Sequence, residues 1–171
     1  ESYTDYKAQR SPPPDDFIEQ IPILKDTLKK LNLLYVELPG YEADDLLGTY
    51  SLIAEKQGIE SLIFTSDQDC WQLISEKVKI MSTAFKTGEW VITGLGRLKE
   101  KLDLEPSQII DYKGLKGDAS DNLPGVKGVG EKTALKLLDQ HKTLETLYEN
   151  LEQVSSKSLK EKLINSKDNA F

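Results

Sequence analysis

The feature that most constrains the fold is an alternation of short apolar runs with helical patterns. Three runs are short and apolar enough to be strands, at residues 33–38, 60–65 and 78–82. Between them, residues 42–56 repeat apolar side chains at helical spacing, and residues 67–75 form a second helical stretch. Strands that alternate with helices are typical of a parallel sheet with right-handed crossovers. We therefore expect an α/β fold in which helices flank a parallel central sheet.

The flanking regions follow other patterns. Residues 15–31 predict an amphipathic helix in which Pro22 causes a kink or a later start, and residues 85–93 predict a hairpin that turns at Gly88. Later helical segments are predicted at residues 95–102, 106–115, 131–140, 143–151 and 156–165. The patterns divide the chain into an α/β core over residues 1–94 and a helical subdomain over residues 95–171.

Composition excludes several classes of protein. No apolar run reaches the length of a membrane span, and no signal peptide is visible. Cys70 is the only cysteine and His141 the only histidine, so an internal disulfide is impossible and a zinc site is not supported. We expect a cytoplasmic protein. The net charge of −7 argues against a general nucleic-acid coat protein.

Acidic side chains form three clusters with a common relation to the predicted fold. Two clusters come soon after the predicted strands 33–38 and 60–65, and the third precedes a glycine-rich turn. Their members are Glu42, Asp44, Asp45, Asp67, Asp69, Asp118 and Asp121. The carboxyl ends of parallel strands lie at one edge of a sheet, where binding sites form. We therefore predict that the clusters converge there. Without these seven groups, acids and bases balance at 22 each.

Each cluster also has a simpler explanation, because acids near a helix N-terminus contribute ~0.3–1 kcal/mol each. Seven converging carboxylates are different, since two like charges 4 Å apart cost roughly 4 kcal/mol at an effective dielectric constant of 20. Such groups must shift their pKa values or bind cations. Ligation by oxygen alone favours Mg²⁺ or Mn²⁺. Two such ions can clamp a phosphodiester for hydrolysis.

The stretch LPGVKGVGEKT, residues 123–133, has the form of a helix–hairpin–helix turn. A glycine-rich turn before a helix can present backbone N–H groups to a phosphate without reading bases. The predicted DNA-binding residues are Gly125, Val126, Lys127, Gly128, Val129, Gly130, Lys132 and Thr133. The alternative is an ordinary loop, since glycine, proline and asparagine are common between helices.

Together these segments resemble the 5′ nuclease family, which includes flap endonucleases and the 5′→3′ exonuclease domain of bacterial DNA polymerase I. The matching segments are YKAQR at 6–10, GYEADD at 40–45, TSDQD at 65–69, QLI at 72–74 and GDASDNLPGVKGVGEKTA at 117–134. They occur in the family's order and spacing, and they span nearly the whole chain. YKAQR is similar to a YKxxR pattern in the family's helical arch, so residues 1–14 are expected to be an arch or linker segment.

The resemblance implies a structure-specific 5′ nuclease with two Mg²⁺ or Mn²⁺ ions held by the seven carboxylates. It implies that Lys7 and Arg10 are catalytic residues contacting the scissile or 5′-terminal phosphate, and that a potassium ion bridges the hairpin turn to DNA. The implied substrates are 5′ ends, flaps and nicks in duplex DNA, and RNA primers. The implied setting is replication and repair in the bacterial nucleoid, by a monomer attached to or working with a DNA polymerase.

One departure from the family pattern is large. The family begins with a strand and helix that carry a further metal-binding aspartate, whereas this chain starts within the arch. The chain is therefore expected to be part of a longer nuclease, or to need a second polypeptide for activity. Two other functions remain open on sequence alone: a duplex-DNA-binding module without catalysis, and a metal-dependent phosphatase for which the hairpin turn would be superfluous.

Overall fold

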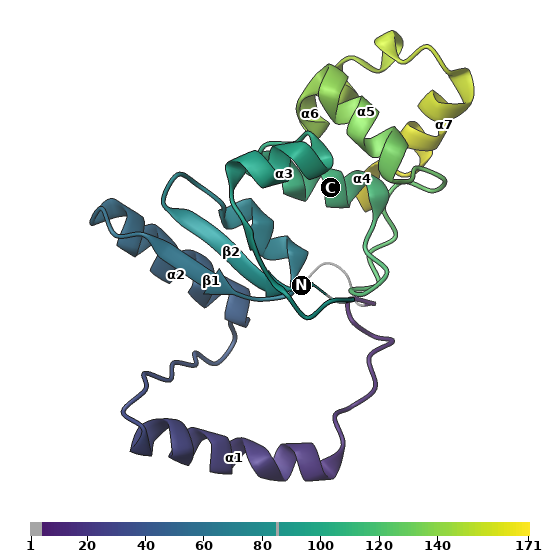
Figure 1. Ribbon diagram of the computed structural model, residues 1–171. Helices are drawn as coiled ribbons and strands as arrows, with labels where there is room; N and C mark the ends of the chain where they lie inside the picture. The colour runs from purple at the N-terminus through teal and green to yellow at the C-terminus, as the bar shows by residue number, and fades with distance from the viewer. Residues whose placement is uncertain (1–4, 85) are drawn as a thin grey trace.

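The computed structural model describes residues 5–84 and 86–171 and shows a small sheet, a helical subdomain and one helix set apart from both (Figure 1). The strands are β1 (Ser61–Phe64), β2 (Val78–Thr83) and β3 (Trp90–Thr93). The α-helices are α1 (Asp15–Lys30), α2 (Ala43–Lys56), α3 (Leu95–Leu102), α4 (Ile109–Lys116), α5 (Glu131–His141), α6 (Leu144–Glu149), α7 (Lys157–Asn165) and α8 (Lys167–Ala170). Short 3₁₀ helices are η1 (Gln68–Leu73), η2 (Pro106–Gln108) and η3 (Leu151–Gln153). The expected mixture of an α/β part and a helical C-terminal part is confirmed.

The sheet has the order β1-β2-β3, with β1 and β2 parallel and β2 and β3 antiparallel. The crossover between β1 and β2 contains η1, so the predicted helical stretch 67–75 is a shorter 3₁₀ helix. The predicted hairpin is confirmed: Ala84 N–H donates to Glu89 O at 2.8 Å, and Gly88 has a φ of +69°. Phe85, at the start of that predicted hairpin, and residues 1–4 lie outside the described residues.

The core lies mainly between the sheet, η1 and the helices of the C-terminal half. Ile63, Val78 and Ile80 supply its strand side, and Leu98 and Leu115 are among its most deeply buried helix residues. Buried apolar area is the largest favourable contribution to folding. The segments after the sheet are therefore the firmly packed ones, and they carry the third acidic cluster.

The prediction of a strand at residues 33–38 is wrong. This segment has no regular secondary structure and pairs with no strand among the described residues. Its apolar side chains remain largely exposed, with Leu34 at 87% and Leu33 at 55% of their full accessible areas. Alternation and β-branching make a segment suitable for a sheet, but a strand needs a neighbour to satisfy its backbone groups.

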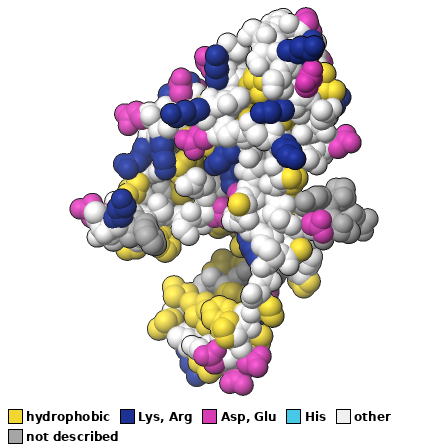
Figure 2. Space-filling view, turned by 90° about the vertical axis from the view of Figure 1, so that its right-hand side faces the viewer, with side chains coloured by type: hydrophobic (Ala, Val, Ile, Leu, Met, Phe, Trp, Pro, Cys, Tyr) yellow, Lys and Arg dark blue, Asp and Glu magenta, His cyan; other side chains and the backbone are white. Residues whose placement is uncertain are grey.

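Helix α1 starts at Asp15 and continues through Pro22, so the predicted later start is not found. The helix has acids in its first turn and lysines in its last, which suits the helix dipole. However, none of its residues is buried, and Phe17, Ile23 and Leu24 are each more than half exposed. The space-filling view shows hydrophobic side chains gathered on this lower part of the molecule (Figure 2). Among the described residues, no helix has both the length and the apolar character to cross a membrane.

The turn before α5 depends on a glycine at a position that has no room for a side chain. Gly125 has a φ of +57°, and an added Cβ would lie 2.2 Å from the backbone nitrogen of Gly117. Val126, next in the chain, donates its N–H to Leu115 O at 2.9 Å. The turn is therefore pressed directly onto the end of α4, with no room for a side chain.

We predict that Gly125→Ala lowers the free energy of unfolding by about 2–4 kcal/mol, because it combines a backbone clash with a left-handed conformation. Chemical denaturation measures the change. The matched control is Gly96→Ala in α3, where an added Cβ meets no atom within 4 Å. It should be neutral or stabilising by up to about 1 kcal/mol. Equal behaviour of the two variants would contradict the described turn.

Candidate functional site

The first two acidic clusters lie at the start of helices that follow extended segments. Glu42 is the N-cap of α2, and its backbone N–H donates to Asp45 Oδ2 at 3.0 Å in a capping box. Asp67 is the N-cap of η1 and accepts from the Asp69 backbone N–H at 3.0 Å. Helix capping therefore accounts for Asp45 and part of the role of Glu42 and Asp67. Capping alone does not account for Asp44 or Asp69.

The third cluster lies in the loop that leaves α4. The Asp118 backbone exchanges hydrogen bonds with that of Leu123, at 2.8 and 2.9 Å, which closes the loop. The Asp118 side chain accepts from the Ser120 backbone N–H at 2.8 Å. The Asp121 residue is only 8% exposed. Neither carboxylate extends into solvent, since the side chain of Asp118 is 14% exposed and that of Asp121 is 11% exposed.

Residues 5–10, which we call the N-terminal strap, connect the first and third clusters. Lys7 Nζ lies 2.5 Å from Glu42 Oε2, and Arg10 Nη2 lies 2.5 Å from Asp121 Oδ1. The Lys7 backbone N–H also donates to Asp121 O at 3.0 Å. The two basic residues predicted to be catalytic are thus beside the predicted metal ligands. Their predicted contact with phosphate stays a prediction.

Lys113, on α4, is a site residue that sequence reasoning missed. Its Nζ forms an ion pair with Asp69 Oδ1 and donates a hydrogen bond to Asp118 Oδ2, and the side chain is only 20% exposed. It therefore joins the second and third clusters. The available signal was its helical position between the apolar residues Tyr112 and Leu115, where a lysine needs a buried partner.

The charges in this region shift each other's pKa values. The pKa of Asp44 is raised, first by partial burial and then by the nearby charges of Asp67 and Glu42. Burial also opposes ionisation of Asp118, but hydrogen bonds from Lys113 and Ser120 outweigh burial and lower its pKa. Lys113 likewise resists the effect of its burial, because Asp118 and Asp69 raise its pKa. Asp118 therefore stays ionised beside its cation partner, whereas Asp44 forms no ion pair within residues 5–84 and 86–171.

The predicted convergence of the seven carboxylates around two ions does not take the form of a closed cluster. Among residues 5–84 and 86–171, no group of three acidic, histidine or cysteine side chains lies close enough together to hold a metal ion. Instead, lysine and arginine side chains stand between the carboxylates. The donor chemistry still suits a hard cation, since all the candidate ligands are oxygens. Moreover, Asp69 Oδ1 is buried and accepts no hydrogen bond of good geometry within the described chain.

The hairpin turn presents only part of the predicted DNA-binding set to solvent. Lys127, Gly128, Gly130 and Lys132 are exposed, whereas Val126 and Val129 are core residues at 1% and 5% exposure. The N–H groups of Val126, Val129 and Thr133 already donate to backbone carbonyls, and Gly125 is buried. The side chains and N–H groups of Val126 and Val129 therefore serve the fold in this structure, and their predicted contacts with DNA stay predictions.

Comparisons with known proteins cover the whole chain. Residues 1–103 match the family model described as "5'-3' exonuclease, N-terminal resolvase-like domain", and residues 104–171 match "5'-3' exonuclease, C-terminal SAM fold". The thermostable DNA polymerase I of Thermus thermophilus is 46% identical over 165 residues, which are 95% of this chain and 19% of that protein. DNA polymerase I of Bacillus subtilis is 44% identical over 170 residues, 99% of this chain and 19% of that protein. The chain thus spans about a fifth of these relatives.

Solved structures show the same fold at lower identity. The T5 D15 protein co-crystallised with metal ions has a TM-score of 0.80 and 24% identity, covering 98% of this chain and 65% of that chain. The catalytic core of Rad2 in complex with DNA substrate has a TM-score of 0.61 and 20% identity, covering 90% of this chain and 50% of that chain.

We predict that Asp44→Asn stabilises the metal-free protein at neutral pH. The folded state holds the Asp44 proton more tightly than the unfolded chain does, so stability falls as pH rises from the usual aspartate pKa through the raised folded pKa. Asparagine lacks this charge. The gain should be about 0.5–1 kcal/mol, since Asp44 is partly exposed, or about 2 °C in Tm.

Thermal unfolding in EDTA between pH 3 and pH 8 tests this prediction. The advantage of Asp44→Asn should be full at neutral pH and disappear once Asp44 is protonated in both states. Asp139→Asn, at an exposed position of α5, should change stability by no more than about 0.5 kcal/mol at any pH. An Asp44→Asn protein less stable than the parent at pH 7.5 would show that the Asp44 charge is favourable.

Proposed function

Because this chain belongs to the 5′-3′ exonuclease family, we propose that it hydrolyses phosphodiester bonds at 5′ ends and 5′ flaps of duplex DNA, with Mg²⁺ or Mn²⁺ as cofactor. The observation that carries this proposal is the linkage of the acidic clusters by Lys7, Arg10 and Lys113. Segments far apart in sequence thereby contribute carboxylates to one region. The similarity to DNA polymerase I supports a role in removing primers and repairing nicks, with a polymerase as partner.

The acidic residues would hold the divalent ions, with Asp44, Asp67 and Asp69 on one side and Asp118 and Asp121 on the other. The ions would supply Lewis-acid stabilisation of the phosphoryl oxygens. Glu42 and Asp45 fix the start of α2 through their capping box, which orients Asp44. A similar solved structure, the T5 D15 flap endonuclease, forms a complex with DNA and metal ions, which supports the same chemistry here.

Lys7 and Arg10 would bind the reacting or 5′-terminal phosphate. Both side chains already lie against site carboxylates, so a phosphate that enters the site meets them without a long movement. A guanidinium forms bidentate hydrogen bonds to phosphate, and an ammonium acts as a point charge. We propose that the divalent ions bind the site carboxylates and that the phosphate binds Lys7 and Arg10. Each group then has a partner of opposite charge.

The hairpin turn would bind the duplex backbone at a distance from the cleavage site. Gly128 and Gly130 carry exposed backbone at the entrance to α5, and Lys127 and Lys132 add positive charge. Lys and Arg side chains are also spread over the helical part in the space-filling view (Figure 2). Contacts of this kind bind backbone without sequence preference. We further propose that a potassium ion binds at this turn. We also propose that the chain divides near residue 94 into an α/β core and a helical DNA-binding subdomain.

The test of catalysis is cleavage of a labelled 5′-flap duplex with Mg²⁺ or Mn²⁺, by this chain and by the longest natural polypeptide containing it. We predict that Asp67→Asn and Asp118→Asn each reduce metal-dependent cleavage at least about 100-fold, because each removes ligand charge worth several kcal/mol in the transition state. Asp139→Asn is the control and should cleave like the parent. Circular dichroism verifies that each variant is folded.

A second function has one observation in its favour. Because no three acidic groups lie within reach of one ion in the described part of the chain, a duplex-DNA-binding module without catalysis remains the rival proposal. It predicts retained DNA binding with no cleavage by either polypeptide under any divalent ion. Cleavage that is lost in the two aspartate variants would rule it out.

Salt dependence tests the hairpin turn separately. We predict that Lys127→Gln and Lys132→Gln each lower the slope of log K against log salt for duplex binding by about 0.9, because each removes one phosphate contact. The control Lys56→Gln, at the end of α2, should leave the slope unchanged. If the turn variants retain the parent slope, the duplex contacts a different surface.

A further inference from the structure

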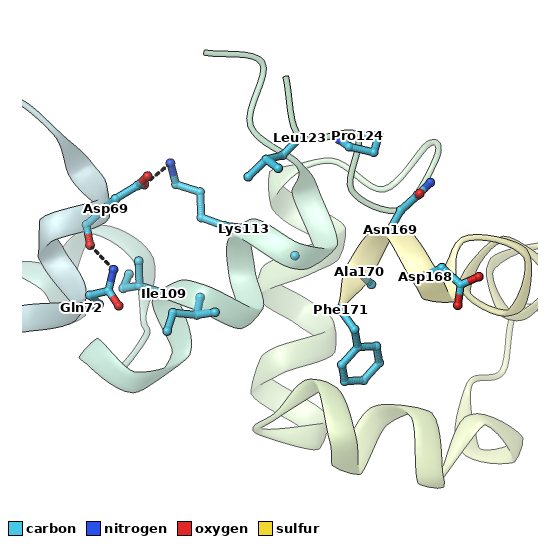
Figure 3. A pocket seen from close by; sticks show the side chains of 12 residues that line it. Asp69, Gln72, Ile109, Lys113, Leu123, Pro124, Asp168, Asn169, Ala170 and Phe171 are labelled. Atoms are coloured by element: carbon cyan, nitrogen blue, oxygen red, sulfur yellow. Dashed lines mark hydrogen bonds and ion pairs between the residues drawn. The ribbon is translucent and has the colours of Figure 1, made fainter. Parts of the chain in front are cut away.

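Helix α4 holds Lys113 in a fixed place between two acidic segments. Its residues Ile109, Tyr112 and Leu115 are buried in the core, at 2%, 5% and 0% exposure. The backbone at Lys113 therefore has little freedom to move. The Lys113 side chain extends toward η1, where Figure 3 shows it directed at Asp69.

Lys113 is shared by two carboxylates that belong to different parts of the fold. Asp69 comes from η1, after the first strand, and Asp118 comes from the loop after α4. The exposed fraction of the side chain is 29% for Asp69, 14% for Asp118 and 20% for Lys113. Burial of this degree weakens screening by water, so the two contacts are stronger than those of a surface ion pair.

The two contacts are unequal in quality. Lys113 Nζ donates a hydrogen bond to Asp118 Oδ2, but Asp69 Oδ1 is buried beside the ammonium without a hydrogen bond of good geometry. An ammonium group has directional N–H donors, whereas a metal ion attracts oxygens from every direction. The ammonium thus neutralises Asp69 without satisfying it. Asp69 is therefore the less firmly held of the two carboxylates.

We propose that Lys113 is an internal counter-ion of the carboxylate site and competes with one divalent ion for Asp69 and Asp118. Without ions, its ammonium joins η1 to the loop after α4. A divalent ion that binds between Asp69 and Asp118 displaces the ammonium from at least one of them. The proposal rests on the proposed function, because it assumes that these carboxylates take up divalent ions.

An ordinary structural ion pair would behave differently. If Lys113 only stabilised the fold, its removal would destabilise the protein and leave ion affinity unchanged or weaker, because two unpaired carboxylates would separate. If Lys113 competes, its removal destabilises the ion-free protein and strengthens ion binding. Ion affinity therefore distinguishes the two roles, and stability alone does not.

The experiment is a titration of Mn²⁺ into the protein without DNA, followed by calorimetry and by electron paramagnetic resonance of free Mn²⁺. Lys113→Met keeps the length of the side chain and removes its charge. We expect this variant to bind Mn²⁺ at least about fivefold more tightly than the parent, the lower end of couplings between ligands that share a protein. In EDTA its Tm should fall, and saturating Mn²⁺ should raise its Tm by more than in the parent.

The matched control is Lys116→Met on the same helix. Lys116 Nζ lies 5.0 Å from the ring centre of Tyr112 and forms no ion pair with a site carboxylate among the described residues. Its Mn²⁺ affinity should equal that of the parent. Equal or weaker Mn²⁺ binding by Lys113→Met would overturn the proposal. If neither the parent nor the variant binds Mn²⁺, the proposed metal-dependent function fails together with this inference. If the parent binds Mn²⁺ and Lys113→Met binds it no more tightly, the inference fails alone.

A measurement on the unaltered protein covers the case in which Lys113→Met does not fold. The side-chain ¹H–¹⁵N signal of Lys113 can be assigned by its absence from Lys113→Arg. In EDTA this ammonium signal should be protected from exchange with water by its carboxylate partners. Saturating Mg²⁺ without DNA should remove that protection. A Lys113 signal that is unchanged at saturating Mg²⁺ would overturn the proposal.

Discussion

The repulsion among closely spaced carboxylates is the constraint on which the site depends. Each acidic segment is tolerated because a basic side chain reaches it from another part of the chain: Lys7 to Glu42, Arg10 to Asp121, and Lys113 to both Asp69 and Asp118. These pairs also determine which segments meet, since each joins residues from two elements. The arrangement that suits cation binding and the arrangement that holds the fold together therefore use the same charges.

Packing supports the two sides of this site unequally. The loop after α4 and the hairpin turn rest on a deeply buried core, and Gly125 allows the two backbones to touch. The strap and α2, in contrast, meet the site mainly through polar and charged contacts that face solvent. Polar contacts at a surface are individually weak. Of the proposed ligands, Asp118 and Asp121 are thus the more firmly placed, and Glu42 and Asp44 the more adjustable.

Much of the fold could be predicted because periodicity reports local structure. The hairpin at Gly88, the helices after residue 95 and the two parallel strands all follow from it. Residues 33–38 could not be predicted, because a strand depends on a neighbour that the pattern does not reveal. The roles of Val126 and Val129 were likewise hidden, since a glycine-rich turn does not show which N–H groups the core already uses. Lys113 was missed because charge in a helix usually faces water.

The exposed apolar side chains of α1 and residues 33–38 have a consequence for the heat of unfolding. Unfolding raises the heat capacity in proportion to the apolar surface that becomes newly exposed, commonly about 12–15 cal/mol/K per residue. Segments whose apolar side chains already face water add little to that change. The heat-capacity increment of this chain should therefore lie below the usual value for its length. Its stability should consequently vary less with temperature than that of a fully covered domain of similar size.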